Sequence, residues 1–185
     1  MRQSELKAIL KDHRLWLESH GKQGKRANLE GADLEGADLE DANLEGADLE
    51  GADLEDANLE GADLEGANLQ GVDLEGANLE GANLRDASLR GANLRDANLT
   101  GAYPEGANFA SANLQDANLQ DANLEDANLV NANLQDAKFT TNFKKVRWFY
   151  DATFSEDQIP WVVLHPKYPQ WADTLKWVKA KADAA

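Results

Sequence analysis

Residues 47–66 read ADLEGADLEDANLEGADLEG, which is one five-residue unit repeated four times. Each unit has Ala first, Asp or Asn second and Leu third, followed by two variable residues. The unit recurs without insertion or deletion 23 times in succession, from Ala27 to Thr141. The exceptions are Val72 at a first position, Ser88, Tyr103 and Lys138 at second positions, and Pro104, Phe109 and Phe139 at third positions. A fixed short period indicates a repeat architecture, so this stretch decides the fold.

A period of five residues fits neither regular secondary structure. Side chains alternate with period two along a strand, and five residues advance a helix by roughly 140°, so either element would scatter the leucines over several faces. The leucines can share one interior only if the chain turns a corner in every unit. Gly or Asp at the fifth position and Asn or Asp at the second favour such corners. The pattern therefore predicts a solenoid with Ala and Leu inside.

The tandem A(D/N)LXX motif of residues 27–141 resembles the pentapeptide-repeat family of the bacterial type. The resemblance implies an all-β solenoid, a right-handed quadrilateral β-helix with four units in each coil. We expect residues 1–26 to form a capping helix and leader, and residues 27–159 to form the β-helix, with an imperfect last coil after residue 141. Residues 160–185 are then a Pro- and Trp-rich segment that ends in a second capping helix.

An amphipathic helix is predicted over residues 4–20, with Ser4 as its N-cap and Gly21 as its C′ residue. One face carries the side chains that fall at helical spacing, namely Leu6, Ile9, Leu10, His13, Trp16 and Leu17. The first coil of a solenoid would otherwise expose its interior and its unpaired edge. We therefore expect this helix to lie across that end as a cap.

The net charge of −16 is unevenly distributed along the chain. Residues 27–81 carry 18 acidic side chains and no basic one, whereas residues 82–136 carry three arginines against eight acids. Four units per coil place residues twenty apart above one another, which predicts an outer acidic column made of Asp33, Glu35, Asp53, Glu55, Asp73 and Glu75. This column is the candidate partner-binding surface. We expect Arg85 to pair with Glu65, and Arg95 with Glu75, across neighbouring coils.

Two further features stand out along the chain. Tyr103-Pro104 interrupts the leucine positions, and we interpret it as a local bulge on the fourth face, with a recognition spot as the alternative. The tail contains tryptophans that we interpret as a cap or, alternatively, as a homodimer contact; they include Trp161, Trp171 and Trp177. The phase of the repeat places Phe149, Phe154 and Ile159 in the interior of the last coil, with Phe143 filling another position.

Residues for catalysis or for holding a cofactor or metal are not apparent in the pattern. There is no cysteine, the three histidines are dispersed, and neither HExxH nor a Gly-rich phosphate loop occurs. A ladder of equivalent solvated carboxylates gives none of them a distinct environment, so an enzyme is disfavoured. The acidic surface disfavours direct nucleic-acid binding, and without an apolar run of roughly 18 residues or a secretory signal we expect a cytoplasmic protein that does not bind membranes.

Three functions are compatible with these features. The first is a non-catalytic structural or protein-interaction scaffold with an unknown protein partner. The second is a DNA mimic that binds DNA gyrase or another type II topoisomerase and confers quinolone protection. The resemblance implies this second function, although the chain has no loop insertions between coils and concentrates its acid at one end. The third is an array of carboxylates that collects divalent cations weakly.

Overall fold

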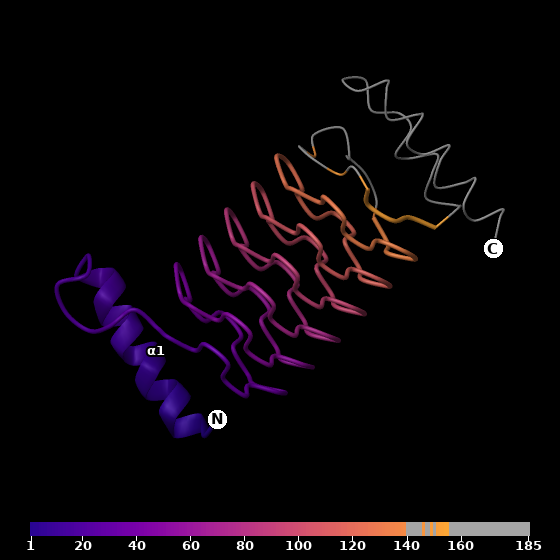
Figure 1. The fold of residues 1–185 in the computed structure, drawn as a ribbon. Coiled ribbons are helices and arrows are strands. Elements are labelled where there is room, and N and C mark those ends of the chain that lie inside the picture. Colours follow the sequence, from indigo (N-terminus) through magenta and orange to yellow (C-terminus); the bar gives the residue numbers. More distant parts are fainter. Residues whose placement is uncertain (140–145, 147–148, 150, 156–185) are drawn as a thin grey trace.

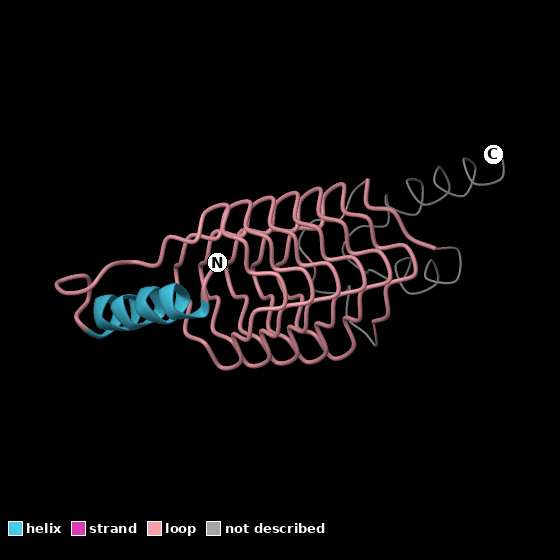
Figure 2. Ribbon diagram, turned by 90° about the horizontal axis from the view of Figure 1, so that it is seen from below, coloured by secondary structure: helices cyan, strands magenta, loops and turns pink. Residues whose placement is uncertain are grey.

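The computed structural model describes residues 1–139, 146, 149 and 151–155. One helix, α1 (Gln3–Glu18), precedes a rod of stacked coils (Figure 1). Residues twenty apart form parallel β-bridges, from Asn28–Asp48 at the N-terminal end to Asn133–Thr153 near the other end. Four five-residue units therefore make one coil, as the resemblance to pentapeptide repeats implies. Each side of the coil is too short to form an extended strand, so the rod is drawn as loop in Figure 2.

Each unit pairs with the next coil and then turns a corner. In a typical unit, the Leu54 N–H donates to the Asp73 carbonyl one coil later at 2.7 Å. The Ala57 N–H donates back to the Leu54 carbonyl at 3.0 Å and closes the turn. Fifth-position residues such as Asp56 adopt φ between 53° and 69°. Gly takes this conformation without strain and Asp or Asn tolerates it, which explains the composition of the fifth position.

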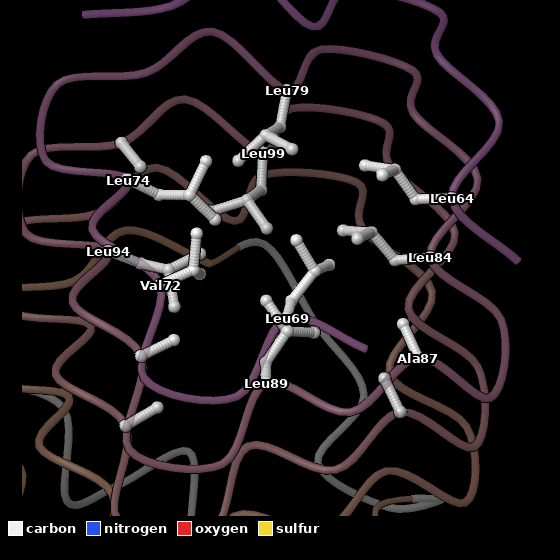
Figure 3. Packing of buried hydrophobic residues seen from close by; sticks show 14 of the residues in the cluster. Leu64, Leu69, Val72, Leu74, Leu79, Leu84, Ala87, Leu89, Leu94 and Leu99 are labelled. Atoms are coloured by element: carbon white, nitrogen blue, oxygen red, sulfur yellow. The ribbon is translucent and has the colours of Figure 1, made fainter. Parts of the chain in front are cut away.

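The interior of the rod is filled by the first and third positions of the units. The third-position leucines are at most 7% exposed, and the alanines of the central coils are fully buried. Figure 3 shows leucines of successive coils, such as Leu64 and Leu84, projecting into the same interior. Each buried leucine contributes about 1.5–3 kcal/mol of transfer free energy. The apolar side chains therefore form one continuous core along the described rod.

Helix α1 lies at the N-terminal end of the rod (Figure 1). Leu6 and His13 are buried, and Ile9 and Leu10 pack partly buried against the core cluster. The helix face that the sequence predicts is therefore the face that covers the first coil. The open end of the core is closed by a helix in place of a neighbouring coil.

The ends of α1 differ from the prediction. The N-cap is Arg2 and not Ser4, because the Glu5 side chain reaches back to accept the Arg2 N–H at 3.3 Å, and the helix gains its first turn earlier. At the other end Ser19 is the C-cap and His20, with φ 55°, occupies the C′ position expected for Gly21. The Gly21 N–H donates to the Trp16 carbonyl at 2.8 Å, as the C″ residue of a Schellman motif does.

The Tyr103-Pro104 position does not form the predicted bulge. The Tyr103 N–H still donates to the Ala82 carbonyl at 2.9 Å, and the Gly106 N–H still donates to the Glu125 backbone carbonyl at 2.8 Å. The register of the coils therefore continues unchanged. Pro104 is buried in the interior column but has no N–H to donate to the next coil. The defect is therefore one missing ladder bond, and no residue is inserted.

The last described coil keeps the phase of the repeat. Phe149 and Phe154 are buried at the interior positions expected for them, together with Val146 and Ala152. Thr153 pairs with Asn133, which continues the 20-residue register. Phe143, Ile159, the expected C-terminal helix and the three tail tryptophans, Trp161, Trp171 and Trp177, lie outside the described residues. The domain boundaries at residues 26 and 159 stay predictions.

Candidate functional site: an acidic face

The structure brings the six predicted carboxylates together on one side of the first three coils. Asp33 pairs with Asp53, and Asp53 with Asp73, through parallel bridges, so these residues form a continuous column, which we call the Asp column. Glu35, Glu55 and Glu75 follow two residues later in each unit. We call the set of six residues the acidic face. The first four along the chain are exposed, and Asp73 and Glu75 are half-buried.

Elsewhere on the rod, a ladder of asparagine amides connects the second positions of successive coils. The Asn78 amide donates to Asn58 Oδ1 at 3.3 Å and to Glu60 Oε2 at 3.2 Å in the coil before it. The same pair of bonds is made by Asn68, Asn83, Asn93 and Asn98. Each amide therefore satisfies an oxygen of the second position and a glutamate of the preceding coil. We call this arrangement the amide ladder.

The acidic face lacks the amide ladder over its first two steps. Asp53 stands one coil above Asp33 and Asp73 one coil above Asp53, and a carboxylate has no N–H to donate. Among the described residues, this is the one column in which Asp stacks on Asp. The ladder resumes at Asn93, whose amide donates to Asp73 Oδ1 at 3.0 Å and to Glu75 Oε2 at 3.1 Å. Glu35 and Glu55 therefore face outward without the amide donor that Glu75 receives.

The electrostatics of the acidic face follow from this stacking. Desolvation and the negative charges of Glu35 and Glu75 raise the pKa of Glu55 above its ordinary value. Local turns hold the carboxylates of the column in place, because Asp53 Oδ1 accepts the Glu55 N–H at 3.1 Å. At the upper end, the Arg95 guanidinium lies 3.2 Å from Glu75, as the sequence predicts. At the lower end, the N-terminal ammonium of Met1 lies 3.9 Å from the Asp33 carboxylate, so each end of the acidic face has a nearby positive charge.

The predicted pair between Arg85 and Glu65 does not form. Glu65 accepts the Asn83 amide at 3.2 Å, and Arg85 turns to the other neighbouring coil, where it lies 3.7 Å from Glu105. Its guanidinium also lies over the Tyr103 ring, 5.8 Å from the centroid. Tyr103 is 47% exposed, so this aromatic side chain remains on the surface.

Other kinds of site are not evident in the part of the chain that the structure describes. No group of three or more His, Cys, Asp or Glu side chains there is arranged to hold a metal ion. No helix within that part has the length and apolar character needed to span a membrane.

Comparison with known proteins assigns the family. The model for pentapeptide repeats matches residues 25–61, 62–101 and 107–141, in 8 copies. The chain belongs to the pentapeptide-repeat family. This family generally consists of non-enzymatic repeat scaffolds. No curated protein sequence matches the chain.

Two solved structures illustrate the similarity. HetL, a pentapeptide-repeat protein involved in heterocyst differentiation regulation in the cyanobacterium Nostoc sp. strain PCC 7120, is 40% identical with a TM-score of 0.53. The match covers 69% of this chain and 60% of HetL, so the chain matches about three fifths of that protein's length. Trypsin-treated QnrB1, a plasmid-mediated fluoroquinolone resistance protein, is 18% identical with a TM-score of 0.50 over 74% of this chain and 83% of its own. The second similarity concerns the fold alone.

Proposed function

We propose that the protein is a non-catalytic protein-interaction scaffold, and that the acidic face is the surface that binds its protein partner. The scaffold is a right-handed quadrilateral β-helix, an inference supported by the 20-residue bridge register and by family membership. The similarity to HetL, which is involved in regulating differentiation, supports a role exercised through other proteins. The cytoplasm remains the expected location.

The observation that carries this proposal is the missing amide ladder between Asp33 and Asp73. Asn occupies the second position in most coils and satisfies its neighbours there. Asp in three successive coils introduces repulsion that the fold does not need. A partner with Lys or Arg side chains at matching spacing would supply the missing donors. Charge-assisted bonds of this kind favour both specificity and rapid association.

The test compares two variants with equal charge. Asp53→Asn/Asp73→Asn restores the amide ladder on the acidic face, and Asp38→Asn/Asp63→Asn removes the same two charges from other faces. We expect a protein captured from native lysate by the wild type to be captured by the second variant and lost by the first. Equal capture by both variants would show that the acidic face is not the surface that binds the partner. Absence of any specific partner would count against the scaffold function itself.

A DNA mimic that binds type II topoisomerase is the second candidate. The observation that favours it is the run of 18 acidic side chains without a basic one over residues 27–81. The uninterrupted coil register weighs against it, because no loop is inserted between coils from Asn28 to Lys138. A DNA gyrase supercoiling assay with ciprofloxacin distinguishes the two functions. Inhibition of gyrase by the protein, or protection of gyrase from ciprofloxacin, would favour the mimic. The absence of both effects would exclude the mimic.

A further inference from the structure

The joint between α1 and the first coil is built around one buried histidine. His13 is 0% exposed, and its Nδ1 accepts the N–H of Ala27, the residue that begins the first coil, at 3.1 Å. The segment that returns from α1 is fixed beside it, because the Lys25 N–H donates to the Asp12 carbonyl at 3.2 Å. The docking of α1 therefore depends on His13 as a hydrogen-bond acceptor.

The bond to Ala27 fixes the protonation state of the ring. Because Nδ1 accepts an N–H, the neutral imidazole carries its proton on Nε2. His13 Nε2 is buried and has no hydrogen-bond partner within the described part of the chain. The site accommodates a neutral histidine with one unsatisfied donor. On the Nδ1 side, a second proton would face the Ala27 N–H and not an acceptor.

The surroundings of His13 contain no carboxylate aimed at the ring. From the connecting segment, the nearby charge is that of Arg26, which lies 3.4 Å from Asp48. From the first coil, the facing group is the backbone of Glu45, whose side chain is exposed. On α1 itself, the side chains of Asp12 and Arg14 are exposed, and Trp16 stacks on the ring with 5.7 Å between centroids. The Glu45 backbone and attraction to the Trp16 ring would favour an imidazolium, and the burial cost of a charge outweighs them.

We propose that protonation of His13 releases α1 from the first coil, so that the helix is an acid-sensitive cap of the β-helix. A proton on Nδ1 would place two donors, Nδ1–H and the Ala27 N–H, against each other. The docked state would lose its hydrogen bond and gain a buried charge. Release relieves both, because the imidazolium then reaches water. The uncovered end exposes the interior of the first coil and its unpaired edge.

The direction of the pH dependence follows from the buried position. Burial lowers the pKa of His13 below its ordinary value, the charge of Arg26 lowers it further, and the Glu45 backbone partly offsets both. A histidine whose pKa is lowered in the docked state binds its proton more readily when undocked. Docking is therefore strongest above the free-histidine pKa of about 6.5 and weakens as the pH falls below it. The docking of α1 stops weakening once the pH falls below the pKa of His13 in the docked state.

Amide hydrogen exchange measures the release even when the open state is rare. The opening constant of α1 is obtained from its amides and from Ala27, corrected for the intrinsic pH dependence of exchange, between pH 7.5 and pH 5.0. We expect it to increase by up to tenfold per pH unit below about 6.5. Leu74 in the middle of the rod serves as an internal reference whose protection should not change in parallel.

Two substitutions separate His13 from other titrating groups. His13→Asn keeps an acceptor oxygen near the position of Nδ1 and does not titrate, so its opening constant should be independent of pH. His20→Asn removes the other described histidine at an exposed position with φ 55°, which Asn tolerates, and should keep the wild-type response. An opening constant that is flat in the wild type, or an equal acid response in His13→Asn, would overturn the proposal. If His13→Asn leaves α1 open at every pH, a wild-type response that His20→Asn retains still supports the proposal, and its loss in His20→Asn contradicts it.

Discussion

Replacing Asp53 by Asn should stabilise the protein, because it extends the amide ladder into the acidic face. The present Asp53 stands between Asp33 and Asp73 at the spacing of adjacent strands, about 4.8 Å. At that distance each like-charge contact costs about 1 kcal/mol in water and less in salt. The new amide would donate to Asp33 Oδ1 and Glu35, as Asn78 does to Asn58 and Glu60 at 3.3 Å and 3.2 Å.

The expected gain is about 1–3 kcal/mol at low salt, combining the relieved repulsion with one or two exposed hydrogen bonds. The turn should survive, since an Asn oxygen can accept the Glu55 N–H that Asp53 accepts now. The reverse change, Asn78→Asp, removes one amide from an intact ladder and adds one charge, so it should destabilise by a similar amount.

Urea unfolding at 25 °C in 20 mM and 500 mM NaCl would measure both variants. Salt should reduce the part of the effect that comes from repulsion and leave the part that comes from the amide bonds. The reasoning would be refuted if Asp53→Asn were neutral or destabilising at low salt while Asn78→Asp had no effect, because the amide ladder would then contribute nothing.

Three further changes have predicted outcomes. Pro104→Leu should raise the urea midpoint, with a gain of about 1 kcal/mol, because it restores a buried leucine and a ladder N–H; an unchanged midpoint would contradict this. Gly24→Ala should weaken the docking of α1, because the new Cβ would lie 2.1 Å from the Asp12 carbonyl oxygen. Gly51→Ala, where a Cβ would meet open space, should leave the docking of α1 intact. Hydrogen exchange of the α1 amides measures both effects. Desolvation and the neighbouring charges of Glu35 and Glu75 raise the pKa of Glu55 above its ordinary value, so the folded protein binds this proton more readily than the unfolded chain and protonation of Glu55 at acidic pH should be stabilising. An NMR titration should show the midpoint of Glu55 falling in Glu35→Gln, and an unmoved midpoint would exclude this coupling.

Much of the architecture could be predicted because the repeat fixes it. The period and the family resemblance were enough to place Asp33, Asp53 and Asp73 in one column, and the apolar face of residues 4–20 was enough to place α1 as a cap. The boundaries of α1 were wrong by one or two residues, because they depend on the reach of the Glu5 side chain and on His20 taking a left-handed conformation. Neither is visible from the apolar pattern.

The amide ladder could not be anticipated from the corner chemistry of Asn and Asp. In the sequence, Asn and Asp are interchangeable corner residues, whereas between coils only Asn can donate. The amide ladder also explains why Arg85 does not pair with Glu65. The Asn83 amide already donates to Glu65, and Arg85 instead contacts Glu105 and the Tyr103 ring. The alternation of Asn and Asp at second positions twenty residues apart is the signal that would have revealed both.

The stacking of residues twenty apart is the central claim, and cysteine cross-linking tests it most directly. The chain contains no cysteine, so Gln70→Cys/Arg90→Cys introduces one pair on adjacent coils, where the Gly71 N–H donates to the Arg90 carbonyl at 3.0 Å. Neighbouring strands are close enough for a disulfide. Pairs of Gln70→Cys with Arg85→Cys or Arg95→Cys lie on different faces and serve as controls. We predict rapid disulfide formation for the 20-residue pair alone; cross-linking at 15 or 25 residues in its place would contradict the four-unit coil and every column derived from it.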